Sequence, residues 1–237
     1  MMARRFCFLF GLLFAVGVYA AESVDLHALS LEDLMDIEVT LTSRSQQRLF
    51  DTPSAVYVLT KEDLRRSGAT GLPEALRLVP GVEVARLDAS KWGVAARGFN
   101  GRFANKILVL IDGRAIYTPF YSGVMWEVRD VLLEDVERIE VIRGPGGTLW
   151  GANAVNGIIN IVTSPAQDTA GGFLRVGGGV EESGLLDARY GWAAAENTDV
   201  RLFARTFAHD AFIDSVGGEG VDDWHMARTG FRLDHHL

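Results

Sequence analysis

The side chains that could carry catalysis or bind a metal are scattered along this chain. Two histidines are adjacent, near the C-terminal end, and a strand there would place them poorly for holding one ion; the five are His27, His209, His225, His235 and His236. No Ser, His and Asp occur at the spacing of a known hydrolase motif. The sequence therefore predicts no enzyme, no metal site and no cofactor.

A glycine-rich run, Gly144-Pro145-Gly146-Gly147, has some features of a phosphate-binding loop. No Gly-Lys-Ser/Thr follows it, Pro145 removes one backbone N–H donor, and the spacing fits neither nucleotide fingerprint. The net charge of −8 also argues against a nucleic-acid partner. We therefore expect neither nucleotide nor nucleic acid to bind.

The first twenty residues predict export. At 237 residues, with 48% hydrophobic and 23% charged residues, the whole chain has ordinary globular composition. Arg4 and Arg5 precede an apolar run, residues 6–18, and Val18-Tyr19-Ala20 has small residues at the cleavage-type positions, which indicates a signal peptide over residues 1–20. A retained membrane anchor is the alternative. Since no later run of eighteen apolar residues occurs, any membrane insertion would use strands.

The stretch from Val136 to Thr163 organises the rest of the chain. Two strand-like apolar runs, residues 138–142 and 158–162, flank a glycine-rich segment. Because glycine lets main chains approach closely, we expect a tightly packed small sheet here. Asn156-Gly157 predicts a short hairpin just before the second run.

This stretch also carries a family resemblance. Residues 137–163, ERIEVIRGPGGTLWGANAVNGIINIVT, resemble the closing signature of the plug domain of TonB-dependent outer-membrane receptors. Trp150 replaces the usual Tyr and Asn156 the first Gly of a pair, changes that keep size class and turn chemistry. The resemblance implies an α+β plug domain over residues 49–164, built as a small mixed sheet with short helices.

Helices and strands are predicted ahead of this signature. Thr60 and Asp63 have capping-box spacing for a helix that ends before Gly68, and a second helix fits residues 73–79. The expected strands are residues 82–86, 94–99 and 107–111, the last turning back at Asp112-Gly113.

Beyond Thr163 the pattern changes to long period-two alternation. Strands are expected at residues 173–180, 185–195, 200–209 and 224–234. By resemblance, residues 165–237 are the first strands of an antiparallel transmembrane β-barrel of twenty-two strands. Four strands cannot close a barrel, so we interpret the chain as the N-terminal fragment of a receptor, without deciding how the fragment arose.

Residues 21–48 are an acidic, thinly apolar leader. Its strand-prone run is Ile37, Glu38, Val39, Thr40 and Leu41, which has no apparent local partner and precedes a polar linker. An unpaired strand on a tether suits addition to another protein's sheet. Its position resembles a TonB box, which implies the periplasmic energy transducer TonB as partner; a plain edge strand is the alternative.

Two arginines, Arg97 and Arg143, each end a predicted strand immediately before glycine. Alone, either is read as a solvated arginine. In the family, arginines matching these positions pair with glutamates of the barrel and hold the plug, a contact for which a guanidinium is well suited. In this chain we expect both to lack those partners.

An aromatic, turn-rich segment contains Tyr117, Phe120, Tyr121 and Trp126. Such side chains either bind a ligand at low entropic cost or seal a core. The resemblance places this part of a plug near its ligand-facing apex, so these four are the candidates for ligand contact.

The predicted function is ligand-gated active uptake across the outer membrane of a Gram-negative bacterium, in contact with outer-membrane lipid. The resemblance implies a small-molecule or metal-chelate cargo such as a ferric siderophore, haem or cobalamin, and no residue selects one. The alternative is a barrel-less periplasmic plug that acts as a binding or interaction module. An exported enzyme is a third class, for which we find no catalytic groups.

Overall fold

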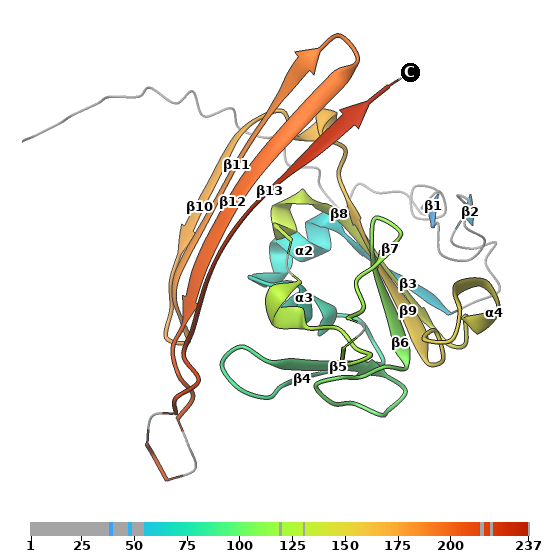
Figure 1. Ribbon diagram of the computed structural model, residues 1–237, viewed down its shortest axis with the longest axis vertical. Helices are drawn as coiled ribbons and strands as arrows, with labels where there is room; N and C mark the ends of the chain where they lie inside the picture. The colour runs from blue at the N-terminus through green and yellow to red at the C-terminus, as the bar shows by residue number, and fades with distance from the viewer. Residues whose placement is uncertain are drawn as a thin grey trace, which may run out of the picture.

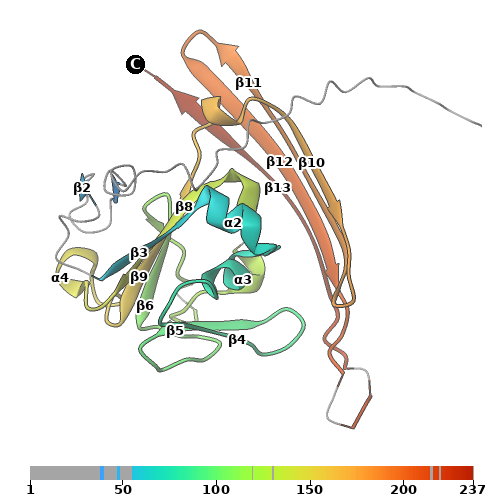
Figure 2. The same ribbon diagram turned by 180° about the vertical axis from the view of Figure 1, so that it is seen from behind.

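The computed structural model describes residues 38–39, 47–48, 55–118, 120–129, 131–213, 216–218 and 220–236. These residues form a mixed-sheet domain and a curved four-stranded sheet that lies along one side of it (Figure 1). The reverse view shows that two short helices, α2 and α3, occupy the side of the domain that faces the curved sheet (Figure 2).

The centre of the mixed-sheet domain is a five-stranded sheet. Its order is β3 (Val56–Thr60), β8 (Val136–Arg143), β9 (Gly157–Thr163), β6 (Ile107–Ile111) and β7 (Arg114–Ala115). β6 and β9 are parallel, and the other neighbours are antiparallel. Ile159 packs in the larger core cluster while adjacent Ile158 packs in a second cluster, so both faces are covered. Burial on both faces explains the unbroken apolar runs.

Two helices follow β3 along the chain. α2 (Lys61–Ser67) begins with a complete capping box between Thr60 and Asp63 and ends at the left-handed Gly68, as the sequence predicts. α3 (Leu72–Leu76) is shorter than the expected helix over residues 73–79, because the last residues close into i→i+3 turns before Pro80. None of the helices in the described residues is long and apolar enough to cross a bilayer.

A two-stranded hairpin packs below the helices. It pairs β4 (Val82–Arg86) with β5 (Trp92–Ala96). β5 ends three residues earlier than the predicted strand over residues 94–99, because Arg97, Gly98 and Phe99 all have positive φ, at 58°, 85° and 60°. Three left-handed residues in succession reverse the chain and end the strand.

The connection from β8 to β9 is not the tight hairpin that Asn156-Gly157 predicts. Residues 144–156 intervene and contain the short helix α4 (Gly147–Trp150). The predicted close approach is confirmed, since a Cβ on Gly157 would lie 2.6 Å from the carbonyl oxygen of Ile142. Asn156-Gly157 therefore serves main-chain packing and not a two-residue turn.

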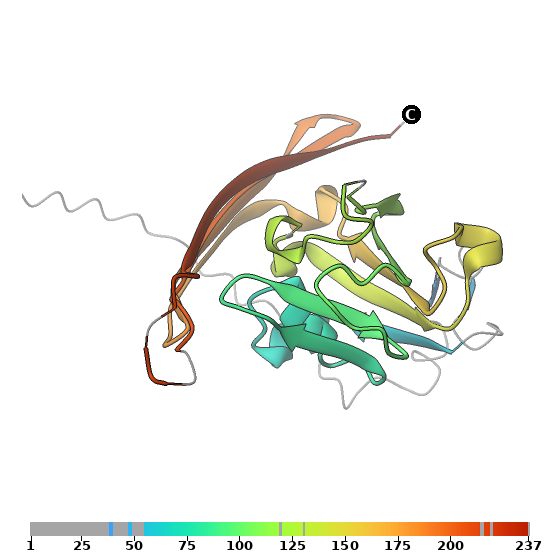
Figure 3. The same cartoon turned by 60° about the horizontal axis from the view of Figure 1, so that its bottom comes forward.

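The curved sheet contains four antiparallel strands in sequence order. They are β10 (Gly171–Gly177), β11 (Glu182–Ala195), β12 (Thr198–His209) and β13 (Trp224–His235), close to the four predicted ranges. Figure 3 shows this sheet bending around one side of the mixed-sheet domain. Three single 3₁₀ turns lie between β7 and β10 in the chain: η3 (Trp126–Val128), η4 (Leu133–Asp135) and η5 (Gln167–Thr169).

One expectation about the leader is wrong. β1 (Glu38–Val39) pairs antiparallel with β2 (Gln47–Arg48), so these two residues of the predicted unpaired strand have a local partner. Ile37, Thr40 and Leu41 lie outside the described residues, as does the predicted signal peptide.

Candidate functional site

The two faces of the curved sheet have opposite character. In β12, Arg201 and Arg205 are 4% and 5% exposed and contact the mixed-sheet domain, whereas Leu202 between them is 48% exposed. Strand alternation and cross-strand register place a set of exposed apolar side chains on that outer face. The set is Leu174, Val176, Leu186, Tyr190, Trp192, Leu202, Phe231 and Leu233. The sheet is thus apolar outside and arginine-rich inside.

Asp135 is the buried acid at which the two parts meet. Its carboxylate, on η4, accepts a 2.7 Å hydrogen bond from Arg189 of β11 and lies 3.2 Å from Nε of Arg201 of β12. The Asp135 residue is 3% exposed. Arg201 also donates to the carbonyl oxygen of Ser164 and the hydroxyl of Thr169, at 2.9 Å and 3.3 Å. One carboxylate therefore joins the domain, the linker and two strands.

A second buried acid, Asp187, lies within the curved sheet itself. Arg175 of β10 donates to it over 2.8 Å, and Nε of Arg205 of β12 lies 3.6 Å away. These residues are direct cross-strand neighbours. Arg205 continues to the mixed-sheet domain, where it donates to the carbonyl oxygens of Thr70 and Val131. Asp187 therefore holds the arginine that reaches across the interface.

Further arginines of β13 extend the same interface. Arg228 donates to the carbonyl oxygen of Val128 over 3.2 Å. Arg232 donates to the carbonyl oxygen and hydroxyl of Thr163, at 3.1 Å and 2.6 Å. Apart from the Thr163 hydroxyl, these acceptors are main-chain carbonyl oxygens of the domain, so the arginines of β13 bind mainly to the domain's backbone through charge-assisted hydrogen bonds.

The tip of the β4–β5 hairpin contacts the connection between β12 and β13. The carboxylate of Asp222 accepts a 2.7 Å bond from the backbone N–H of Ala89, and His209 Nδ1 lies 2.8 Å from the Ala89 carbonyl oxygen. The Arg86 guanidinium lies 5.2 Å from the ring of Trp92 and 4.6 Å from that of Phe212. The hairpin tip is thus bound from several directions.

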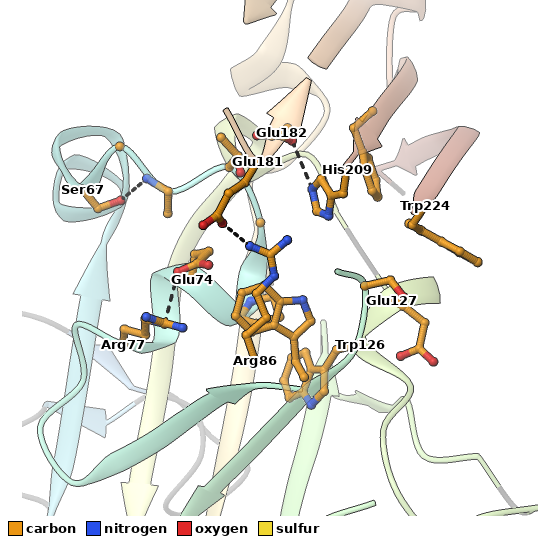
Figure 4. A pocket seen from close by; sticks show the side chains of 18 of the residues that line it. Ser67, Glu74, Arg77, Arg86, Trp126, Glu127, Glu181, Glu182, His209 and Trp224 are labelled. Atoms are coloured by element: carbon orange, nitrogen blue, oxygen red, sulfur yellow. Dashed lines mark hydrogen bonds and ion pairs between the residues drawn. The ribbon is translucent and has the colours of Figure 1, made fainter. Parts of the chain in front are cut away.

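A cavity of about 460 Å³ lies between this hairpin, the two helices and the ends of β11 to β13. Figure 4 shows Arg86 at its centre, paired with Glu181, while His209 is directed toward Glu182. Three tryptophans contribute to the wall: Trp92, Trp126 and Trp224. The cavity combines aromatic faces with charged groups of both signs, a surface suited to a polar ligand or to water.

The two arginines predicted to contact a barrel wall bond within the mixed-sheet domain. Arg97 donates to the carbonyl oxygen of Arg143, and Arg143 donates to that of Pro80, each over 3.0 Å. Within the described residues neither guanidinium has a carboxylate at ion-pair distance. The interface that the structure does contain uses other arginines, which belong to the curved sheet.

The four aromatic candidates do not share one environment. Phe120 is 89% exposed, and Tyr121 is 55% exposed and stacks on Phe103 at 4.9 Å between centroids. Tyr117 is half-buried and donates to the carbonyl oxygen of Ile107, and burial raises its pKa to about 12. Trp126 is 5% exposed and packs in the core. Of these four, only Phe120 and Tyr121 are exposed on the surface, whereas Trp126 contributes to the wall of the cavity described above.

Sequence reasoning missed the residues that form the interface. Asp135, Arg189 and Arg201 belong to no motif. One signal was present: β12 carries Arg201 and Arg205 on the face opposite Leu202, and charged residues on the inner face of a curved sheet need partners inside it. The alternation identifies the inner face of β12, but it does not show which of several nearby acids pairs with the arginines on that face.

Comparison with known proteins identifies this arrangement. Residues 48–158 match the family model of the TonB-dependent receptor plug domain. The chain belongs to the TonB-dependent receptor family. The mixed-sheet domain is its plug, and we call the curved sheet the wall. This membership confirms the resemblance seen in residues 137–163 and the predicted fold class. TonB-dependent receptors are proteins of the outer membrane and not enzymes, so this chain belongs to an outer-membrane protein.

Curated relatives include vitamin B12 transporters. BtuB of Vibrio vulnificus (strain CMCP6) is 32% identical, over 83% of this chain and 36% of the transporter. BtuB of Vibrio cholerae serotype O1 (strain ATCC 39541 / Classical Ogawa 395 / O395) is 28% identical, over 90% of this chain and 34% of that protein. The chain thus spans about a third of the length of the curated relatives it matches.

Solved receptor structures share the fold. The FpvAI–pyocin S2 complex superposes with a TM-score of 0.66 at 19% identity, covering 84% of this chain and 26% of that one. The pyoverdine outer membrane receptor FpvA of Pseudomonas aeruginosa PAO1, bound to pyoverdine, gives 0.60 at 21% identity, covering 75% and 25%. At these identities the likeness concerns the fold alone.

Proposed function

We propose that this chain is the plug and first wall strands of a transporter that takes up a scarce nutrient across the outer membrane by ligand-gated opening. The observation that carries the proposal is the plug bound against a sheet whose outer face is apolar and whose inner face is arginine-rich. An apolar outer face suits contact with outer-membrane lipid. This face also argues against the barrel-less periplasmic module, which would expose it to water.

The proposed boundaries are those expected from the sequence: a signal peptide over residues 1–20, a leader over 21–48, the plug over 49–164 and wall strands over 165–237. In this scheme the segment Ile37 to Leu41 binds TonB by adding a strand to it. The pairing of β1 with β2 means that TonB must either compete with Gln47–Arg48 or use the free edge of β1.

Substitution of Val39 by proline tests the TonB contact. Proline removes a ladder N–H and fixes φ, so binding to the periplasmic domain of TonB in a pull-down should be lost. Ser45→Pro, in the polar linker, is the matched control and should still bind. Retention of binding by the Val39→Pro chain would show that strand addition does not occur through this segment.

Phe120 and Tyr121 are the proposed ligand contacts. By analogy with relatives named as transporters of vitamin B12 and a receptor bound to pyoverdine, the ligand is a cobalamin or an iron chelate. Calorimetric titration with cobalamin, haem and a ferric siderophore should reveal one ligand whose affinity falls at least about tenfold on Tyr121→Ala, the loss of one aromatic contact. Equal binding by wild type, Tyr121→Ala and Phe120→Ala would remove these residues from the site.

A further inference from the structure

The arginines of the wall make two different kinds of contact with the plug. Most are arginine bonds to main-chain carbonyl oxygens: Arg205 to Val131, Arg228 to Val128 and Arg232 to Thr163. Asp135 differs, because its side-chain carboxylate lies between Arg189 and Arg201 of neighbouring strands. One carboxylate oxygen contacts Arg189 and the other contacts Arg201, and the Asp135 residue is 3% exposed.

These two kinds of contact restrict the plug differently. A backbone presents a carbonyl at every residue, so a displaced plug can offer a flexible arginine another acceptor or a water molecule. The charges of Arg201, which is buried, and of Arg189, whose side chain is 11% exposed, need a counter-charge at one position. Asp135 supplies that counter-charge, and its own backbone carbonyl accepts a 2.8 Å bond from Ser164, where the chain leaves the plug.

Other acids at the boundary are less able to set the position. The side chain of Asp112 is 43% exposed and lies 3.7 Å from Arg232. The side chain of Glu181, which pairs with Arg86, is 70% exposed. Exposed pairs of this kind contribute little and tolerate displacement, because water screens them.

We infer that Asp135 is the positioning residue that sets where the plug docks on β11 and β12, through Arg189 and Arg201. The docking position is then specified by one carboxylate of the plug and two cations of the wall, the opposite polarity to the pairing predicted for Arg97 and Arg143. This inference does not depend on which nutrient is carried or on TonB.

Two spin labels measure docking in the full chain held in detergent micelles. The labels are attached to cysteines that replace Ala85, exposed on β4, and Leu202, exposed on the outer face of β12. Cys7 is changed to serine so that it takes up no label. Urea is added until the label-to-label distance changes. Asp135→Asn should lower the midpoint of that change by about 1 M or more, the shift expected when buried charges lose their partner.

Matched variants separate charge from general damage. Glu134→Gln, the neighbouring acid of the same 3₁₀ turn, should leave the midpoint unchanged, and Asp135→Glu should recover part of the loss because it keeps a carboxylate. A midpoint for Asp135→Asn equal to wild type, or for Asp135→Glu as low as for Asp135→Asn, would overturn the inference.

A wall variant keeps the test decisive if Asp135→Asn prevents the plug from folding, as judged by tryptophan fluorescence in a background in which the wall tryptophans, Trp192 and Trp224, are changed to phenylalanine. Arg189→Gln with Arg201→Gln leaves every plug residue intact and should lower the docking midpoint while preserving the plug signal. An unchanged midpoint in this double variant would equally overturn the inference.

Discussion

The guanidinium of Arg97 donates a 3.0 Å hydrogen bond to the backbone carbonyl oxygen of Arg143. This bond joins the end of β5 to the end of β8, two strands that belong to different sheets of the plug. Arg97 holds this position from a left-handed backbone, with φ of 58°. The pair thus contributes to the internal structure of the plug.

Substitution of Arg97 should separate the strain of its backbone from the value of its bond. Arg97→Ala and Arg97→Gly both lose the bond to Arg143, but only glycine adopts positive φ without cost. We expect Arg97→Gly to be more stable than Arg97→Ala by about 1 kcal/mol in urea unfolding. Equal stability of the two variants would mean that the backbone at this position is not left-handed in solution.

The capping box at the start of α2 should be measurable. Thr60 accepts from the Asp63 N–H, and the Asp63 carboxylate accepts from the Thr60 N–H. Thr60→Ala should lower the free energy of unfolding of the plug by about 1 kcal/mol, since both bonds depend on the pair. Thr60→Ser keeps the hydroxyl and should stay close to wild type. A loss of similar size in both would point to the threonine methyl group instead.

Gly157 should not tolerate a side chain. Its added Cβ would lie 2.6 Å from the carbonyl oxygen of Ile142, a backbone atom that cannot rotate away. We expect Gly157→Ala to cost about 1–3 kcal/mol in denaturant unfolding, as overpacking does. Gly184→Ala is the strand control, because no atom lies within 4 Å of its added Cβ. A smaller loss for Gly157 than for Gly184 would contradict the packing described here.

Asp88 should make the plug sensitive to acid. Burial raises the pKa of this carboxyl, but the bonds from Lys91 and from the backbone N–H groups of Ser90 and Lys91 outweigh it, so the pKa is held below its usual range. A lowered folded pKa gives stability that is complete above the unfolded pKa, about 3.9, and is lost as pH falls through the folded value. Asp88→Asn should therefore be less stable than wild type at pH 7, with the difference shrinking below about pH 4. A difference that persists unchanged at pH 2 would exclude this ionisation as its cause.

Substitution of Trp126 should destabilise the protein far more than substitution of Phe120. Trp126 is 5% exposed and Phe120 is 89% exposed. Trp126→Ala should cost about 3–5 kcal/mol because it empties part of the core. Phe120→Ala should change unfolding by no more than about 0.5 kcal/mol, since the ring contacts mainly solvent. Comparable losses for both would show that Phe120 is covered in solution.

The sequence predicts elements well where local chemistry decides them. The capping box of Thr60 and Asp63 locates α2, and the unbroken apolar run locates β6 at its exact bounds of residues 107–111. Long alternation locates the wall strands, because a sheet with two different faces needs it over many residues. Each of these signals is local, because the residues that produce it lie close together in the sequence.

The sequence predicts less where distant parts of the chain decide the outcome. Trp126 reads like its aromatic neighbours, yet the core encloses it while Phe120 stays in solvent. Asn156-Gly157 has hairpin chemistry, but the closeness of Ile142 determines its role. Asp135 is one of several acids before β8, and only the tertiary structure places it between two arginines.

The bond from Arg205 to the carbonyl oxygen of Thr70 spans 135 positions of the chain. A contact between residues so far apart in sequence forms only after the intervening segments are ordered. Closing a long loop costs entropy, and the stabilising bonds form only once the loop is closed. Thr70 lies between α2 and α3, two short helices whose backbone bonds join residues close in sequence, and it precedes the whole wall in the chain. The plug should therefore fold early, with docking of the wall as the slow, late event that limits the rate of maturation.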